Sequence, residues 1–161
     1  MPLLEHELLN LCASLVIGLL IGGLFRKRII ALAAAFMGAV LIDLDHLFDY
    51  FLAFNFHFKL NYFLKGYEFL KNDKIFVLFH AWESVVVLLL LSFFAQKKNS
   101  AVAAFSAALA LGLFFHLMID TQVNHMYPQS YSLIYRVTHQ FETKELVPPE
   151  EYNAHAQRKL E

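Results

Sequence analysis

Eight side chains that could bind a metal ion lie inside otherwise apolar stretches of the sequence. The stretches are residues 29–54, 75–95 and 100–120, and they contain no lysine or arginine. An unpaired carboxylate near the centre of a bilayer costs about 2.5–3.5 kcal/mol, so this set needs a proton or a bound cation, and the imidazoles favour a transition metal. The predicted metal ligands are Asp43, Asp45, His46, Asp49, His80, Glu83, His116 and Asp120.

The spacing of these residues from the nearest basic residues predicts that they meet at one depth. Counted along helices from Arg28, Lys97 and Lys98, the three groups lie about 21–33 Å away. His80 and Glu83 share a helix face, and so do His116 and Asp120.

Some members of the set have a second interpretation. Asp43 and Asp45 cannot point at one spot on a regular helix, so one of them is expected to orient a ligating histidine. Glu83 is either a ligand or the general base, and it is the candidate catalytic residue. Asn124 continues the stripe of His116 and Asp120, and His125 follows it, so both are predicted to bind substrate. His6, near the N-terminus, is expected to be a surface residue.

The elements that must position these residues are predicted to be membrane helices. The chain of 161 residues is 58% hydrophobic and only 17% charged, with a mean hydropathy of +0.50, which is typical of a protein in lipid. We expect a single all-α domain over 1–161, with about four transmembrane helices at 8–25, 29–54, 75–95 and 100–120. Residues 55–74, rich in aromatics and lysines, are predicted to lie at the membrane interface, and 121–161 to form a polar extramembrane tail.

Composition and charge exclude several classes of protein. The net charge of −1 gives no basic footprint for nucleic acid, and the single cysteine, Cys12, excludes a disulfide framework and a cysteine-based zinc site. Basic residues at 26–28 and 97–98 indicate, by the positive-inside rule, that the acidic cluster lies on the non-cytoplasmic side, although lysines in 55–74 oppose this orientation.

Two short motifs resemble those of the bacterial inner-membrane metal-dependent hydrolases, a family of small polytopic proteins, and a third departs from the family's pattern. The first is Asp43-Leu44-Asp45-His46, after an apolar helix with Gly38-Ala39, and another is His116-Leu117-Met118-Ile119-Asp120. The middle motif of the family is usually Thr-His-Ser, where this chain has Phe79-His80-Ala81. The resemblance covers roughly residues 30–125, and it implies a hydrolase in a bacterial inner membrane.

The leading hypothesis is therefore a membrane-embedded metal-dependent hydrolase, most plausibly a phosphoesterase acting on a lipid or lipid-linked substrate. One or two divalent ions per chain, Zn, Mn or Fe, fit the donor set. Two alternatives are a metal or proton transporter and a non-catalytic membrane scaffold with a structural metal. The apolar halves of the spans, without ionisable groups, argue against a transport path.

Overall fold

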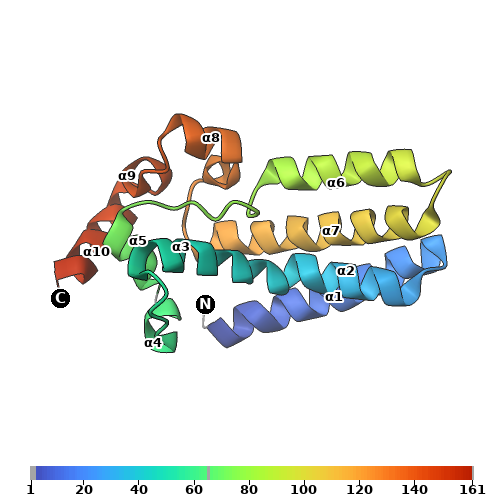
Figure 1. Cartoon of the computed structure of the whole chain (residues 1–161), viewed down its shortest axis with the longest axis horizontal. Helices are drawn as coiled ribbons and strands as arrows, with labels where there is room; N and C mark the ends of the chain where they lie inside the picture. Colours follow the sequence, from blue (N-terminus) through green and yellow to red (C-terminus); the bar gives the residue numbers. More distant parts are fainter. Residues whose placement is uncertain (1–2, 65, 161) are drawn as a thin grey trace.

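In a computed structural model of this chain, residues 3–64 and 66–160 are described, and the regular elements among them are all helical. A lone β-bridge joins Lys74 to Glu142. The elements, shown in Figure 1, are α1 (Leu3–Phe25), α2 (Arg28–Ala39), η1 (Leu41–Asp45), α3 (His46–Phe54), α4 (Leu60–Phe63), α5 (Tyr67–Asn72), α6 (Trp82–Ala95), α7 (Ser100–Val123), η2 (Pro128–Tyr131), α8 (Leu133–Thr138), α9 (Thr143–Leu146) and α10 (Pro149–Leu160).

Four helices form the bundle. α2 packs against both α1 and α7, and α6 packs against the outer side of α7 (Figure 1). The contact of α2 with α7 depends on two glycines: a Cβ on Gly38 would lie 2.4 Å from the Leu109 carbonyl oxygen, and one on Gly112 would lie 2.6 Å from that of Ala35. Small residues let the two backbones approach closely, as is common in membrane helix pairs.

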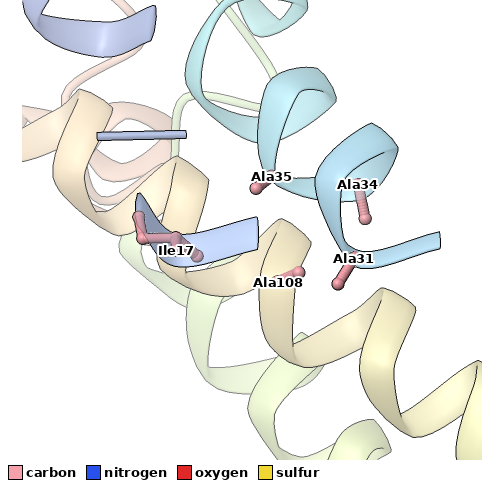
Figure 2. Close-up of a cluster of buried hydrophobic side chains, with 5 residues drawn as sticks. All are labelled: Ile17, Ala31, Ala34, Ala35 and Ala108. Atoms are coloured by element: carbon pink, nitrogen blue, oxygen red, sulfur yellow. The ribbon is translucent and has the colours of Figure 1, made fainter. Parts of the chain in front are cut away.

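An apolar cluster fills the space between α1, α2 and α7. Ile17 of α1, three alanines of α2 and Ala108 of α7 are buried together, and Figure 2 shows their side chains in the space between these helices. Because four of the five are alanines, the helices can pack closely at this level. The cluster separates the connector end of the bundle from the end that carries the acidic residues.

The prediction of about four spans is met only in part. Two helices are long and apolar enough to cross a membrane, Glu5–Phe25 and Ser100–Val123, and a third span results if α2 is counted with the bent continuation that follows it. α6 has 14 residues and is about 21 Å long, short of the roughly 30 Å hydrocarbon core. Its apolar side chains nevertheless face outwards, as on Val87, Phe93 and Phe94, which suits lipid contact.

The predicted helix over 29–54 is broken. α2 ends at Ala39, a short 3₁₀ turn follows, and α3 continues at an angle of 52°. This 3₁₀ turn, Leu41–Asp45, contains Asp43 and Asp45, the two carboxylates that a regular α-helix could not direct to one spot. The break therefore falls where the acidic motif lies.

The predicted span 75–95 begins later than expected, at Trp82, because residues 75–81 form an extended segment with a turn at Leu78 and Phe79 in place of a helix. The backbone of this segment binds other parts of the chain. The predicted interfacial segment contains α4 and α5. The predicted tail is not without structure: it folds into η2, α8, α9 and α10, which lie at the same end of the bundle as α3 and α5 (Figure 1).

Candidate metal centre

Three donor atoms from three separate elements converge at the end of the bundle opposite the basic connectors. Asp43 Oδ1, from η1, lies 3.3 Å from His80 Nε2 and 3.3 Å from His116 Nε2, and the two imidazole nitrogens lie 3.2 Å apart. His80 comes from the extended segment before α6, and His116 from the last turns of α7. Each pair is separated by at least 36 residues in sequence, so only the fold brings them together.

The partners of the other ring nitrogens indicate which tautomers are present. His116 Nδ1 lies 3.0 Å from the Ala39 carbonyl oxygen, and His80 Nδ1 lies 3.3 Å from Asp45 Oδ2. Both partners are acceptors, so each Nδ1 is placed to donate its hydrogen, and the neutral form of each ring would present the Nε2 lone pair to the triangle. In that form, three lone pairs would face one another. A proton on one nitrogen would satisfy part of this arrangement, whereas a cation satisfies all three donors at once.

The distances in this triangle match those between ligands of a tetrahedral metal. With metal–ligand bonds of about 2.0–2.1 Å, neighbouring ligand atoms of a zinc ion are about 3.3 Å apart. Asp120 Oδ2 is placed as a fourth donor, 3.3 Å from His116 Nε2 and 4.0 Å from His80 Nε2. Asp43, His80, His116 and Asp120 could therefore hold one divalent ion.

Asp45 has the supporting role that the sequence assigned to one member of its pair. Its Oδ2 accepts a hydrogen bond from the Phe79 backbone N–H at 2.7 Å and lies against His80 Nδ1. A carboxylate in this position fixes the orientation of the imidazole and raises its basicity as a ligand. Asp45 thus contacts the candidate ligand His80 rather than the triangle of donor atoms.

His46 lies at the edge of the cluster. Its Nε2 is 3.7 Å from Asp43 Oδ1, its ring stacks edge-on against that of His80, and one donor atom each of Asp43, His46 and His80 lie within 4.8 Å of one another. His46 is therefore close enough to serve as a further ligand.

Asp49, predicted as a ligand, is not brought into the cluster. Its two oxygens accept hydrogen bonds from the Phe76 and Val77 backbone N–H groups at 2.9 and 2.8 Å. It anchors the extended segment that leads to His80. Val77 has φ +30°, a strained conformation for a β-branched residue, so this anchor holds the segment in a shape it would not adopt alone.

Arg136, in α8, holds the same segment from the other side. Its guanidinium donates to the carbonyl oxygens of Phe76, Val77 and His80, and the side chain is fully buried. Burial lowers the pKa of Arg136, and the nearby carboxylates of Asp45 and Asp49 oppose that change. The C-terminal region therefore positions a predicted metal ligand, a role that sequence patterns did not indicate.

Glu83, predicted as ligand or general base, also lies outside the cluster. Its carboxylate accepts hydrogen bonds from the Ser132 hydroxyl and from the backbone N–H groups of Leu133 at 3.0 Å and Ile134 at 3.2 Å. These are the unpaired donors of the first turn of α8, where a carboxylate is favoured. Glu83 thus fixes α8, and α8 carries Arg136.

His6 was expected at the surface, and the structure corrects this. The side chain is buried, its Nε2 lies 3.0 Å from Asp120 Oδ1, and its ring lies 5.6 Å from that of His116. A signal was present in the sequence: His6 precedes Arg26 by 20 residues, about 30 Å along a helix, the same depth as the other groups.

Two cavities adjoin the cluster and share His46 and Asp120 in their walls. One, of about 400 Å³, lies against the C-terminal region, and both predicted substrate-binding residues, Asn124 and His125, line it. Asn124 also donates to the Tyr131 hydroxyl at 3.2 Å. This cavity is the more polar of the two.

The other cavity, of about 540 Å³, is bordered by apolar side chains of α4 and α5, among them Phe63 and Phe69. Leu60 and Phe56, next to this border, are largely exposed. Glu68 also lines the cavity; burial raises its pKa to about 7, and one of its oxygens has no partner. Phe69, Asp120 and Asn124 line both cavities, so the two adjoin the same cluster, and each combines polar with apolar side chains.

Comparisons of the chain with protein-family models, with curated proteins and with solved structures gave no match.

Proposed function

We propose that this protein is a membrane-embedded metal-dependent hydrolase that acts on a lipid or lipid-linked phosphate ester. The observation that carries the proposal is the triangle of Asp43 Oδ1, His80 Nε2 and His116 Nε2, with edges of 3.2–3.3 Å. A bound Zn, Mn or Fe ion would polarise a phosphoryl oxygen and lower the pKa of a bound water.

The charges around the triangle support a cation. Of the ion pairs among the described residues, none joins Asp43, Asp45 or Asp120 to a lysine or an arginine. Arg136, the nearest buried base, is engaged by three backbone carbonyls. Carboxylates that are buried with histidines but without a lysine or an arginine are stabilised by a metal ion, and neutral imidazoles would complete its coordination.

The two cavities support an amphiphilic substrate. The cavity lined by His125 and Arg136 would receive a headgroup, and the cavity lined by Phe63 and Leu64 would receive the start of an acyl or prenyl chain. Asn124 and Phe69 line both cavities, so they would contact the substrate where the two parts meet. The exposed apolar side chains of Phe56 and Leu60 would lie at the membrane surface beside the cavity lined by Phe63. We place this end of the bundle on the non-cytoplasmic side, as the basic connectors indicate.

A transporter needs a polar route through the bundle. Residues 29–42 and 100–115 contain no charged side chain, and the alanine-rich cluster around Ile17 fills the space between the helices below the site. A site that is closed at one side suits catalysis better than passage.

The test is metal content and turnover of protein purified in detergent. We expect stoichiometric Zn, Mn or Fe by elemental analysis, and release of phosphate from a panel of phospholipids and polyprenyl phosphates. His116→Ala should lose both, whereas His57→Ala, at an exposed histidine, should keep both. Full activity or unchanged stability without metal would refute the proposal. Bound metal without turnover on any member of the panel would favour the scaffold, and metal flux into liposomes would favour the transporter.

A further inference from the structure

Asp120 directs its two oxygens to opposite sides. Oδ2 lies 3.3 Å from His116 Nε2 and faces the triangle of donors described above. Oδ1 lies 3.0 Å from Nε2 of His6, on α1. The carboxylate is buried, as is the His6 ring, so both contacts are shielded from bulk water. A carboxylate that offers one oxygen to each side is the usual bridge between two metal ions in two-metal sites.

α1 supplies more donors on the His6 side. Glu7 Oε1 lies 3.7 Å from His6 Nδ1, and one donor atom each of His6, Glu7 and Asp43 lie within 4.8 Å of one another. His6, His116 and Asp120 form a second such group. Asn10, one turn further along α1, is fully buried; its Nδ2 lies 3.2 Å from His6 Nε2, and its Oδ1 has no hydrogen-bond partner among the described residues. Nitrogen and oxygen donors therefore collect beside the first position, on a helix that does not contribute to it.

The negative charge of the nearby carboxylates also exceeds the charge of one divalent ion. Four carboxylates belong to the cluster or touch it: Glu7, Asp43, Asp45 and Asp120. One divalent ion balances two of these charges, whereas two divalent ions balance all four; the side chains of Asp45 and Asp120 are buried, and those of Glu7 and Asp43 are 36% and 32% exposed.

We propose that α1 completes a second divalent-cation position, held by His6 and Glu7, with Asp43 and Asp120 shared between the two ions. This inference rests on the proposed function, since it assumes the first metal position. Two adjacent ions suit the in-line displacement at phosphorus, where one ion activates the attacking oxygen and the other stabilises the leaving oxygen. The substrate would then be a phosphate ester whose leaving group is a lipid alcohol: water would form the new P–O bond, the bond from phosphorus to the alcohol oxygen would break, and that oxygen would take up a proton.

The experiment counts metal ions per chain in full-length, monodisperse protein. Wild type, loaded with Mn²⁺ and desalted, should hold two ions per chain, and its electron paramagnetic resonance spectrum should show the coupling of a bridged pair. His6→Ala should hold one ion and give the spectrum of an isolated ion. Glu7→Gln, which keeps the shape of the side chain, should weaken the second ion at least tenfold. His57→Ala is the matched control and should retain two coupled ions.

The outcomes separate this inference from the proposed function. A wild type with one ion, or a His6→Ala variant that still holds a coupled pair, would overturn the second position and leave the first intact; in the former case His6 would be a hydrogen-bond partner of Asp120. A wild type without any metal would overturn both. If His6→Ala fails to fold, Glu7→Gln still decides, since two equally tight ions in that variant would contradict the proposal.

Discussion

Replacing Arg136 with methionine should loosen the segment that carries His80. Methionine keeps much of the side-chain volume and removes the guanidinium, which donates to the carbonyl oxygens of Phe76, Val77 and His80 from a fully buried position. The variant leaves these buried carbonyls without a donor, in a stretch whose Val77 is held at φ +30°. The extended segment should therefore relax away from its native path.

The size of the effect follows from those contacts. A hydrogen bond to a charged group contributes about 1.5–3 kcal/mol, and the loss of three is offset in part because a buried charge is no longer desolvated. We expect a net loss of about 3–5 kcal/mol, which corresponds to a fall in apparent Tm on the order of 10 °C. Displacement of His80 should in addition weaken metal binding about 10–100-fold, as expected for a group that positions a ligand.

Thermal unfolding in detergent and a competitive metal titration measure the two quantities. Lys144→Met is the control, because Lys144 lies in the same C-terminal region, is exposed and pairs only with Glu142 and Glu145. Exposed pairs contribute little, so this variant should stay within about 0.5 kcal/mol of wild type. An Arg136→Met protein with the Tm and metal affinity of wild type would refute the idea that the C-terminal region positions His80.

Two further predictions concern the packing of the helix bundle and the buried side chain of Glu68. Gly112→Ala should lower the free energy of unfolding by about 1–3 kcal/mol, since the new Cβ would lie 2.6 Å from a backbone carbonyl oxygen of α2. Gly23→Ala, where a Cβ meets nothing within 4 Å, should raise it by about 0.5–1 kcal/mol. Equal Tm values for the two variants would contradict the close packing of α2 on α7. Glu68 has a pKa raised by burial to about 7, so its folded state binds a proton more tightly than its unfolded state, and stability should fall as the pH rises from about 4.5 through 7. Glu68→Gln should then exceed wild type by up to about 3 kcal/mol at pH 8 and match it near pH 4, and parallel stability curves for the two proteins would rule out the buried carboxyl.

Counting residues from basic anchors was sufficient to place His80, His116 and Asp120 at one depth, because helical rise is nearly constant and charged residues stay at the ends of apolar helices. The same count, applied to α1, would have reached His6. The count could not distinguish the side chains that face the donor triangle from carboxylates that bind backbone N–H groups elsewhere. Asp49 and Glu83 are also carboxylates at the depth predicted for the cluster, yet their oxygens accept hydrogen bonds from backbone N–H groups 27 and 50 residues away in the sequence.

The break at residues 40–45 in the predicted helix over 29–54 could be predicted from the sequence only in part. The pair Asp43 and Asp45 required a departure from regular helix if both were to act at one place, and the 3₁₀ turn supplies it. The late start of α6 had no such signal, since Ile75-Phe76-Val77-Leu78 is as apolar as the helix that follows. Its extended form depends on Asp49 and Arg136, which bind its backbone groups from outside.

By itself, the sequence determined that this is a helical chain suited to lipid, with unpaired carboxylates and imidazoles at one end of its apolar helices. Hydropathy, small-residue packing and helical rise are local properties, and they can be read along the chain. The tertiary structure decided which of those groups meet: Asp43, His80, His116 and Asp120, with His6 added and Asp49 and Glu83 withdrawn. That selection depends on which buried N–H and carbonyl groups need partners, and those groups become neighbours only when the chain has folded.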